Sequence, residues 1–344
     1  MRIWRNILLG GVALIVLLVV AGAWALNSAR ATGFILQSLL ARTVPAVEVR
    51  GVSLGGLVYS YPASWELKDV RLNLRLNQKP AIITAPRLKA GEVLRLLKDG
   101  QRVSIELGNA EISWDKLKAV GVSGRTVLAR AAGSVAYSGE LSAAQVTWDQ
   151  LTVDQVRVAL SGDTRELECK DLTAAAYGGA LTGKARLMFT AVPGYALEVD
   201  YRNLETWRLD RALGGAFGEL GGKLSGRFKA AGQGERITVL EVSSGMPAGG
   251  QVSAALLSSI ASYLPSSAQK KRLEFLISSG GKLAVEVFSF TIRNDAPDHL
   301  SGEIGLKSRE MNLELNVSHE ITVDARIDAL LKAWQALASG RSGR

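Results

Sequence analysis

Hydrophobic and polar residues alternate along most of this chain. The stretch 67–76 reads Leu-Lys-Asp-Val-Arg-Leu-Asn-Leu-Arg-Leu, so the apolar side chains at its even positions from 70 onward fall on one face. Three later segments repeat this period of two, with apolar positions at Val156, Val158 and Leu160; at Tyr195, Leu197, Val199 and Tyr201; and at Met311, Leu313, Leu315 and Val317. Strict alternation is typical of antiparallel sheets with one apolar and one solvated face. The sequence therefore predicts a mainly β fold.

Short helical segments interrupt this pattern. Apolar residues recur at helical spacing at 34–43, 91–98, 203–213, 252–264, 269–277 and 327–337. The first of these segments stops at Pro45, and we expect it either to pack on the end of the domain or to lie at a membrane surface. No regular strand–helix–strand alternation is present, which argues against a parallel Rossmann-type sheet.

Paired glycines recur in a loose motif. Residues 178–183 and 221–226 both read Gly-Gly-x-Leu-x-Gly, and Gly55-Gly56-Leu57 is a partial copy. Glycine tolerates positive φ, so each pair is predicted to close a hairpin ahead of an alternating strand. Successive hairpins of this kind would build an elongated antiparallel sheet.

The N-terminal region departs from the alternation. Residues 7–26 contain no charge, and as a helix they would span about 30 Å, the thickness of a bilayer core. Because Arg2 and Arg5 precede this run, the positive-inside rule predicts 1–6 as a cytoplasmic tail, 7–26 as a single-pass transmembrane anchor and the rest of the chain as periplasmic. A signal peptide cleaved near 21–23 is the alternative, and it exports the same remainder.

The chain of 344 residues carries a formal net charge of +9, yet its charge pattern does not indicate nucleic-acid binding. Lys and Arg mostly occur singly and near Asp or Glu, and the densest basic run, Lys270-Lys271-Arg272, is soon followed by Glu274. A diffuse positive charge suits anionic lipid headgroups as well as an ordinary solvated surface. We therefore expect no nucleic-acid partner.

Two motifs resemble catalytic or nucleotide-binding signatures but lack their structural context. Residues 51–55 match Gly-x-Ser-x-Gly, but Ser53 lies inside an alternating segment, and no helix follows as a nucleophile elbow requires. Residues 178–184 match most of a phosphate-binding loop, but Ala185 occupies the position of the magnesium-binding Ser or Thr, and a strand pattern follows. Neither motif predicts an active site.

The single cysteine and the two histidines complete the candidate chemistry. A lone cysteine excludes an intrachain disulfide and a cysteine metal cluster, and the charged neighbours of Cys169 predict an inward-facing strand residue. His299, with Asp295 and Asp298, has the residue types of a metal site, although a solvated turn is the simpler interpretation; His319 adjoins a strand end. We predict no catalytic, cofactor-binding or metal-binding residue and no enzymatic activity.

The order of these elements resembles that of the AsmA-like superfamily, the inner-membrane-anchored relatives of TamB and YhdP. The resemblance rests on the apolar N-terminal run, the strand pattern at 47–54, the helix and strand pattern at 93–107 and glycine-turn segments such as 221–226. It implies an elongated, curved β-sheet, shaped like a taco, whose groove-like concave face is apolar and shields lipid acyl chains. It carries no invariant chemical residue over to this chain.

These observations lead to a hypothesis for organisation and function. We expect an AsmA-like N-terminal β-rich region at 27–213 and a C-terminal β-rich region with helices at 214–344. The resemblance implies intermembrane lipid transport or outer-membrane biogenesis, with phospholipid or another acyl lipid, the inner membrane and other cell-envelope proteins as partners. The alternative is a structural or assembly component of an envelope machine, similar to the N component of type II secretion. The candidate groove residues are Val156, Val158, Leu160, Met311, Leu313, Leu315 and Val317.

Overall fold

The computed structural model describes residues 47–60, 64–76, 79–91, 100–131, 134–163, 165–190, 192–213, 220–234, 236–262, 266–296, 299–310 and 312–322. Most of these residues lie in β-strands. The chain divides into two compact units, Met1–Ala144 and Gln145–Arg344, which are referred to below as the first and second unit.

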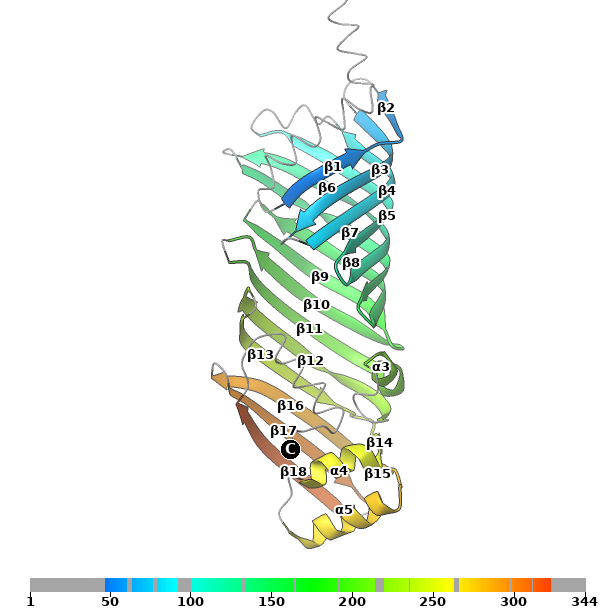
Figure 1. Ribbon diagram of the computed structural model, residues 1–344, viewed down its shortest axis with the longest axis vertical. Coiled ribbons are helices and arrows are strands. Elements are labelled where there is room, and N and C mark those ends of the chain that lie inside the picture. Colours follow the sequence, from blue (N-terminus) through cyan, green and yellow to red (C-terminus); the bar gives the residue numbers. More distant parts are fainter. Residues whose placement is uncertain are drawn as a thin grey trace, which may run out of the picture. The chain divides into compact units, whose positions relative to one another are not determined.

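The strands of the first unit form an antiparallel sheet (Figure 1). In chain order they are β1 (Val47–Ser53), β2 (Gly56–Ser60), β3 (Ser64–Leu76), β4 (Lys79–Gly91), β5 (Arg102–Trp114), β6 (Leu117–Ala131) and β7 (Ser134–Trp148), which continues into the second unit at Gln145. From β3 to β6 each strand pairs with the next one along the chain. Leu67 of β3, Val103 of β5 and Val122 of β6 are buried, so one face of this sheet is apolar.

The strands β1 and β2 at the edge of this sheet do not form the hairpin that Gly55 and Gly56 predict. β1 and β2 both pair with β3, and both run antiparallel to it. Gly55 and Gly56 therefore lie at a break between two segments of one sheet edge. The hairpin predicted there is wrong, because the chain continues in the same direction along β3 instead of reversing.

The second unit is a longer antiparallel meander. Its long strands are β8 (Leu151–Gly162), β9 (Glu166–Ala176), β10 (Gly179–Met188), β11 (Gly194–Glu205), β12 (Gly221–Gln233), β13 (Arg236–Gly245), β16 (Val287–Ala296), β17 (His299–Ser308) and β18 (Leu313–Thr322). Each strand from β8 to β13 pairs with the next, β13 pairs with β16, and β17 and β18 follow.

Short elements are inserted into this meander at two points. The helix α3 (Thr206–Ala212) lies between β11 and β12. Between β13 and β16 the chain forms β14 (Gly250–Val252), α4 (Ala254–Ser262), α5 (Ala268–Ser278) and β15 (Leu283–Val285). Because β13 pairs directly with β16, the second insertion leaves the long sheet continuous within this unit.

Bulges interrupt several strands at residues with positive φ. Asn109 in β5 and Asn203 in β11 adopt this conformation, and their backbone N–H groups donate to the hydroxyls of Ser123 and Ser225 on the next strand. Asn and Asp tolerate the left-handed backbone region better than most other residues. A bulge bends its strand and increases the local twist, so these positions curve the sheet within each unit.

The turn between β9 and β10 confirms the hairpin predicted at Gly178–Gly179. Tyr177 and Gly178 both have positive φ, as a tight turn between antiparallel strands requires. The same motif at Gly221–Gly222 is not a turn, because both residues open β12 and pair with β14. The hairpin predicted there is wrong: the chain between β11 and β12 forms α3 instead of a tight turn.

Three predicted helices are confirmed. The segments 203–213, 252–264 and 269–277 correspond to α3, α4 and α5. α3 begins later than predicted, at Thr206, because β11 extends to Glu205. At the start of α5, the Ser267 hydroxyl accepts a hydrogen bond from the Lys270 N–H, which satisfies one of the free donors of the first turn.

The remaining helical predictions are not described by the structure. Apart from Gly91, which ends β4, they lie outside the described residues: 34–43, 92–98 and 327–337, together with the uncharged run at 7–26. Within the described ranges, no helix is both long and apolar enough to cross a membrane.

The predicted alternation is confirmed most clearly in β18. Leu313 and Leu315 are buried, whereas Glu314 and Asn316 are exposed. The mainly β, antiparallel fold with a few short helices is thus confirmed. The division between the two units falls between Ala144 and Gln145, whereas the boundary predicted from the sequence follows residue 213.

Candidate functional site

The long strands of the second unit direct their apolar side chains to one face of the sheet. Phe228 in β12 pairs with Val199 in β11 and with Val242 in β13, and Val242 pairs with Ile292 in β16. Directly paired residues project to the same side of a sheet. The register therefore aligns these four side chains in a row across four strands, and this side is referred to below as the apolar face.

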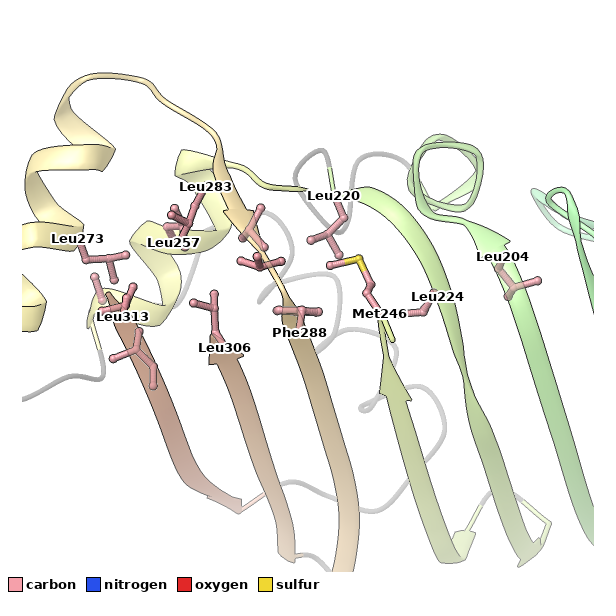
Figure 2. Packing of buried hydrophobic residues seen from close by; sticks show 14 of the residues in the cluster. Leu204, Leu220, Leu224, Met246, Leu257, Leu273, Leu283, Phe288, Leu306 and Leu313 are labelled. Atoms are coloured by element: carbon pink, nitrogen blue, oxygen red, sulfur yellow. The ribbon is translucent and has the colours of Figure 1, made fainter. Parts of the chain in front are cut away.

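Helices cover one end of the apolar face (Figure 2). Leu257 of α4, Leu273 of α5 and Leu313 of β18 meet in a buried cluster, and none of them is more than 2% exposed. The other buried members of this covered cluster are Ala176, Leu204, Leu220, Leu224, Met246, Val252, Ala261, Leu283, Val285, Phe288, Leu306 and Leu315. It is an ordinary hydrophobic core, built between the strand ends and the helices.

The rest of the apolar face lies outside the covered cluster. Most of its side chains are half-buried, although Ala230 is buried and Leu187 is exposed, and none of them belongs to that cluster or packs against it. These residues, referred to as the open face, include Val156, Val158, Leu160, Leu172, Leu197, Val199, Phe228, Val242 and Ile292. A contiguous apolar surface of this kind is typical of an interaction site.

The reverse face of the same strands is charged. The Lys184 ammonium lies 3.1 Å from the Glu198 carboxylate, and the Arg227 guanidinium lies 2.7 Å from the Asp200 carboxylate. The hydrogen bond from Lys184 lowers the pKa of Glu198, and the one from Arg227 lowers the pKa of Asp200. Both carboxylates are therefore ionised at neutral pH, and the sheet is amphipathic, with its charges on the side away from the open face.

Two tyrosines of β11 lie on either side of Val199 on the apolar face. The Tyr201 hydroxyl hydrogen-bonds to the Ser244 hydroxyl on the side of the covered cluster. The Tyr195 hydroxyl lies beside Gly232, where a Cβ would come within 2.5 Å of it. Burial raises the pKa of both phenols, so they stay neutral at physiological pH and add no charge to the apolar face.

Cys169 lies in the strand β9, as the sequence predicts. It pairs with Leu160 in β8 and with Ala185 in β10, so its side chain lies on the apolar face. The residue is half-buried, and this burial raises the pKa of its thiol. The thiol is therefore mostly protonated at neutral pH, which is the poorly nucleophilic form.

The structure separates the two groups of predicted groove residues. Val156, Val158 and Leu160 of β8 are half-buried and lie on the open face. Leu313 and Leu315 of β18 are buried in the covered cluster, and Val317 packs against it. Met311 lies outside the described residues.

The open face also contains residues that the hydrophobic pattern does not single out, including Phe228, Val242 and Ile292, which pair in one row across β12, β13 and β16. Glycine and alanine occupy several apolar-face positions of β12, such as Gly226 and Ala230, and they weaken the hydrophobic signal there. The charged residues of the reverse face still alternate along this strand. The alternation of Lys223, Arg227 and Lys229 would have placed Phe228 on the apolar face, even though few large apolar residues alternate in this strand.

Other candidate chemistry finds little support in the described residues. Among them, no group of three or more His, Cys, Asp or Glu side chains is placed to hold a metal ion. Ser53 ends β1 and is followed by β2, not by a helix, and Lys184 lies within β10. His299 begins β17 and is exposed.

Comparison with other proteins does not identify a family for the chain. No protein-family model matches the sequence, and no curated protein or solved structure is significantly similar to it.

Proposed function

We propose that this chain is a membrane-anchored protein of the bacterial cell envelope that holds the acyl chains of phospholipid, or of another acyl lipid, against the open face. The observation that carries the proposal is the open face itself. Its apolar side chains lie in register from β8 to β16, outside the covered cluster, while the reverse face of the same strands is solvated and ion-paired. A sheet with this distribution presents one side to hydrocarbon and the other to water.

The energetics of burial favour an acyl chain as the occupant. Each methylene transferred from water to an apolar surface contributes about 0.8 kcal/mol, so a chain of about fifteen methylenes gains on the order of 10 kcal/mol before the costs of ordering it. This interaction needs no directional polar contact. It is therefore suited to a surface of Val, Leu, Ile and Phe side chains with neutral tyrosines at its borders.

The AsmA-like resemblance and the N-terminal sequence favour the envelope setting. The uncharged run at 7–26 is suited to anchoring the chain in the inner membrane, with the bulk of the chain in the periplasm. In this proposal the acyl path crosses β8 at Val156, Val158 and Leu160 and continues over Val199 and the paired strands. The start of β18 is not part of the path, because its leucines are packed under the helices.

Site-specific photo-crosslinking tests this function with a matched control on one strand. Phe228 lies on the open face, and its neighbour Lys229 is exposed on the reverse face. A benzoyl-phenylalanine replaces either residue in the full chain, cells are irradiated, and mass spectrometry identifies the adducts. We expect acyl-lipid adducts at position 228 in several-fold excess over position 229, because only position 228 contacts the lipid.

Other crosslinking patterns would contradict the proposal. Equal lipid labelling at the two positions would show adventitious contact with membrane lipid. Labelling at position 228 by another segment of the same chain would show that the open face is internal core. Labelling at position 228 by a different protein would favour the alternative, a structural component of an envelope machine.

A further inference from the structure

The helix α5 carries an aromatic side chain that the fold does not use. Phe275 is 74% exposed, although phenylalanine is a residue that folded proteins usually bury. Leu273, two positions earlier, is fully buried in the covered cluster. At about 100° per residue, Phe275 projects from the side of the helix almost opposite to Leu273. Its exposure thus follows from the way α5 is anchored.

Two basic residues of α5 lie on or beside the helix face that carries Phe275. Lys271 precedes Phe275 by four positions and lies on the same helix face, and Arg272 lies at the border of that face. Both are exposed, and within the described residues neither forms an ion pair. The segment 254–282 contains four basic residues and only one acidic residue, Glu274. The outer side of α5 is therefore both aromatic and cationic.

The helix α3 also exposes an aromatic ring beside basic side chains, one of which, Arg208, is ion-paired with Glu205 at 2.7 Å. Trp207 is 50% exposed, and the guanidinium groups of Arg208 and Arg211 lie 5.2 Å and 5.4 Å from the centre of its ring. The inner side of α3 is fixed by Thr206, whose hydroxyl donates to the Leu220 carbonyl at 2.6 Å. Trp207 and its two arginines are thus held on the outside of the helix.

Both helices lie at the same end of the strands. α3 connects the end of β11 to the start of β12, and α4 and α5 lie between the end of β13 and the start of β16. Because these strands are antiparallel neighbours, the two connections leave the sheet at the same end of the strands, as Figures 1 and 2 show. This end of the second unit, referred to as the helical end, therefore exposes two aromatic rings among basic side chains.

We propose that the helical end docks on an anionic phospholipid membrane surface. Phe275 and Trp207 enter the interfacial layer, where aromatic rings are favoured. Lys271, Arg272 and Arg211 face the headgroups, and each basic side chain near such a surface strengthens binding about fivefold, which is about 1 kcal/mol converted at 1.4 kcal/mol per tenfold. The charge complementarity selects anionic over zwitterionic lipid. This surface is distinct from the open face, and the proposal does not depend on what occupies that face.

Phe189 at the opposite end of the strands provides a matched control. It follows β10, is 42% exposed, and its backbone N–H donates to the Arg165 carbonyl in the connection between β8 and β9. This connection carries Asp163 as well as Arg165, so the opposite end has no excess of positive charge there. Phe189 is thus also an exposed phenylalanine, although less exposed than Phe275, and it lacks the basic surroundings of Phe275.

Vesicle flotation with the full chain tests the proposal. The chain is reconstituted into nanodiscs of phosphatidylcholine and mixed with separate vesicles, made either of phosphatidylcholine alone or with about a third of phosphatidylglycerol. We expect the nanodiscs to float with the anionic vesicles only. Phe275→Ser should weaken this flotation several-fold, and the double change Lys271→Gln with Arg272→Gln should weaken it by about fivefold for each charge. Phe189→Ser should leave it unchanged.

The outcomes decide the assignment. Flotation that is lost at high salt and in the Lys271→Gln, Arg272→Gln variant, with the melting temperature retained, supports docking through α5. Equal flotation with neutral vesicles, retained flotation in that double variant, or an equal loss in Phe189→Ser overturns it. A chain that does not float but binds an acidic protein through the same residues also overturns the membrane assignment.

Discussion

A glutamate introduced at either of two positions on the apolar face should have very different effects on stability. Leu313 lies in the covered cluster and is 2% exposed, whereas Val199 lies on the open face and is half-buried. Leu313→Glu places a carboxylate under α4 and α5, where no water reaches it. Val199→Glu places the same group beside Phe228, where it can remain hydrated when the face is empty.

The magnitude at Leu313 follows from its burial. Loss of the buried leucine side chain removes about 1.5–3 kcal/mol, and a carboxylate in an apolar core has its pKa raised by up to about 3–5 units, each worth about 1.4 kcal/mol. The total of about 5 kcal/mol or more is comparable to the whole stability of a domain, which is about 5–15 kcal/mol. For a unit of this size we expect Leu313→Glu to lower the melting temperature by on the order of 10–20 °C. Val199→Glu should lower it by only a few degrees.

The pH dependence distinguishes the two variants further. The carboxyl group introduced by Leu313→Glu has a folded-state pKa above its unfolded value of about 4.3. Its ionisation penalty is therefore absent below that pH, grows as the pH rises from there to the folded-state pKa, and is constant above it. The stability gap to the wild type should therefore narrow toward pH ~4. A hydrated carboxylate introduced by Val199→Glu should show little such dependence.

Thermal melting of the full chain, followed by far-ultraviolet circular dichroism between acidic and neutral pH, measures both effects. A melting temperature for Val199→Glu as low as that for Leu313→Glu would refute the distinction between open and covered regions. An unchanged melting temperature for Leu313→Glu would instead show that α4 and α5 do not exclude water from the cluster. With the fold intact, Val199→Glu should still reduce lipid crosslinking at position 228.

Two further predictions concern the apolar face and the packing of its strands. Alkylation of Cys169 by a maleimide should be slower than that of free cysteine at neutral pH and should accelerate as the pH rises, because burial raises the thiol pKa; a rate equal to that of free cysteine would contradict this placement. Gly226→Ala should destabilise the second unit by about 1–3 kcal/mol, since its Cβ would lie 2.0 Å from the Ser243 carbonyl oxygen. Gly51→Ala, whose Cβ would meet only the Asn73 side chain at 3.8 Å, is the control in the same melting experiment.

Strands and short helices could be predicted from the sequence because each leaves a local period. The alternation from Leu313 to Val317 is a strand in the structure, and the helical spacing at 269–277 is α5. The glycine pairs were less informative, because the same local sequence closes a turn at Gly178 but opens a strand at Gly221. What distinguishes them is the partner strand, and strand pairing is a long-range property that no short motif contains.

The accessibility of the candidate site also depends on long-range packing that the local sequence does not contain. Leu315 and Val199 belong to equally regular alternating segments, and both project to the apolar face, yet only Leu315 is packed beneath helices. The difference arises from the insertion between β13 and β16, which places α4 and α5 over one end of a sheet whose strands differ little from end to end. Alternation predicts which side chains lie on the apolar face of a sheet, but not whether other parts of the chain or a ligand cover that face. In this chain α4 and α5 cover the apolar face at the helical end, so the apolar residues accessible to a ligand are those that these helices leave uncovered.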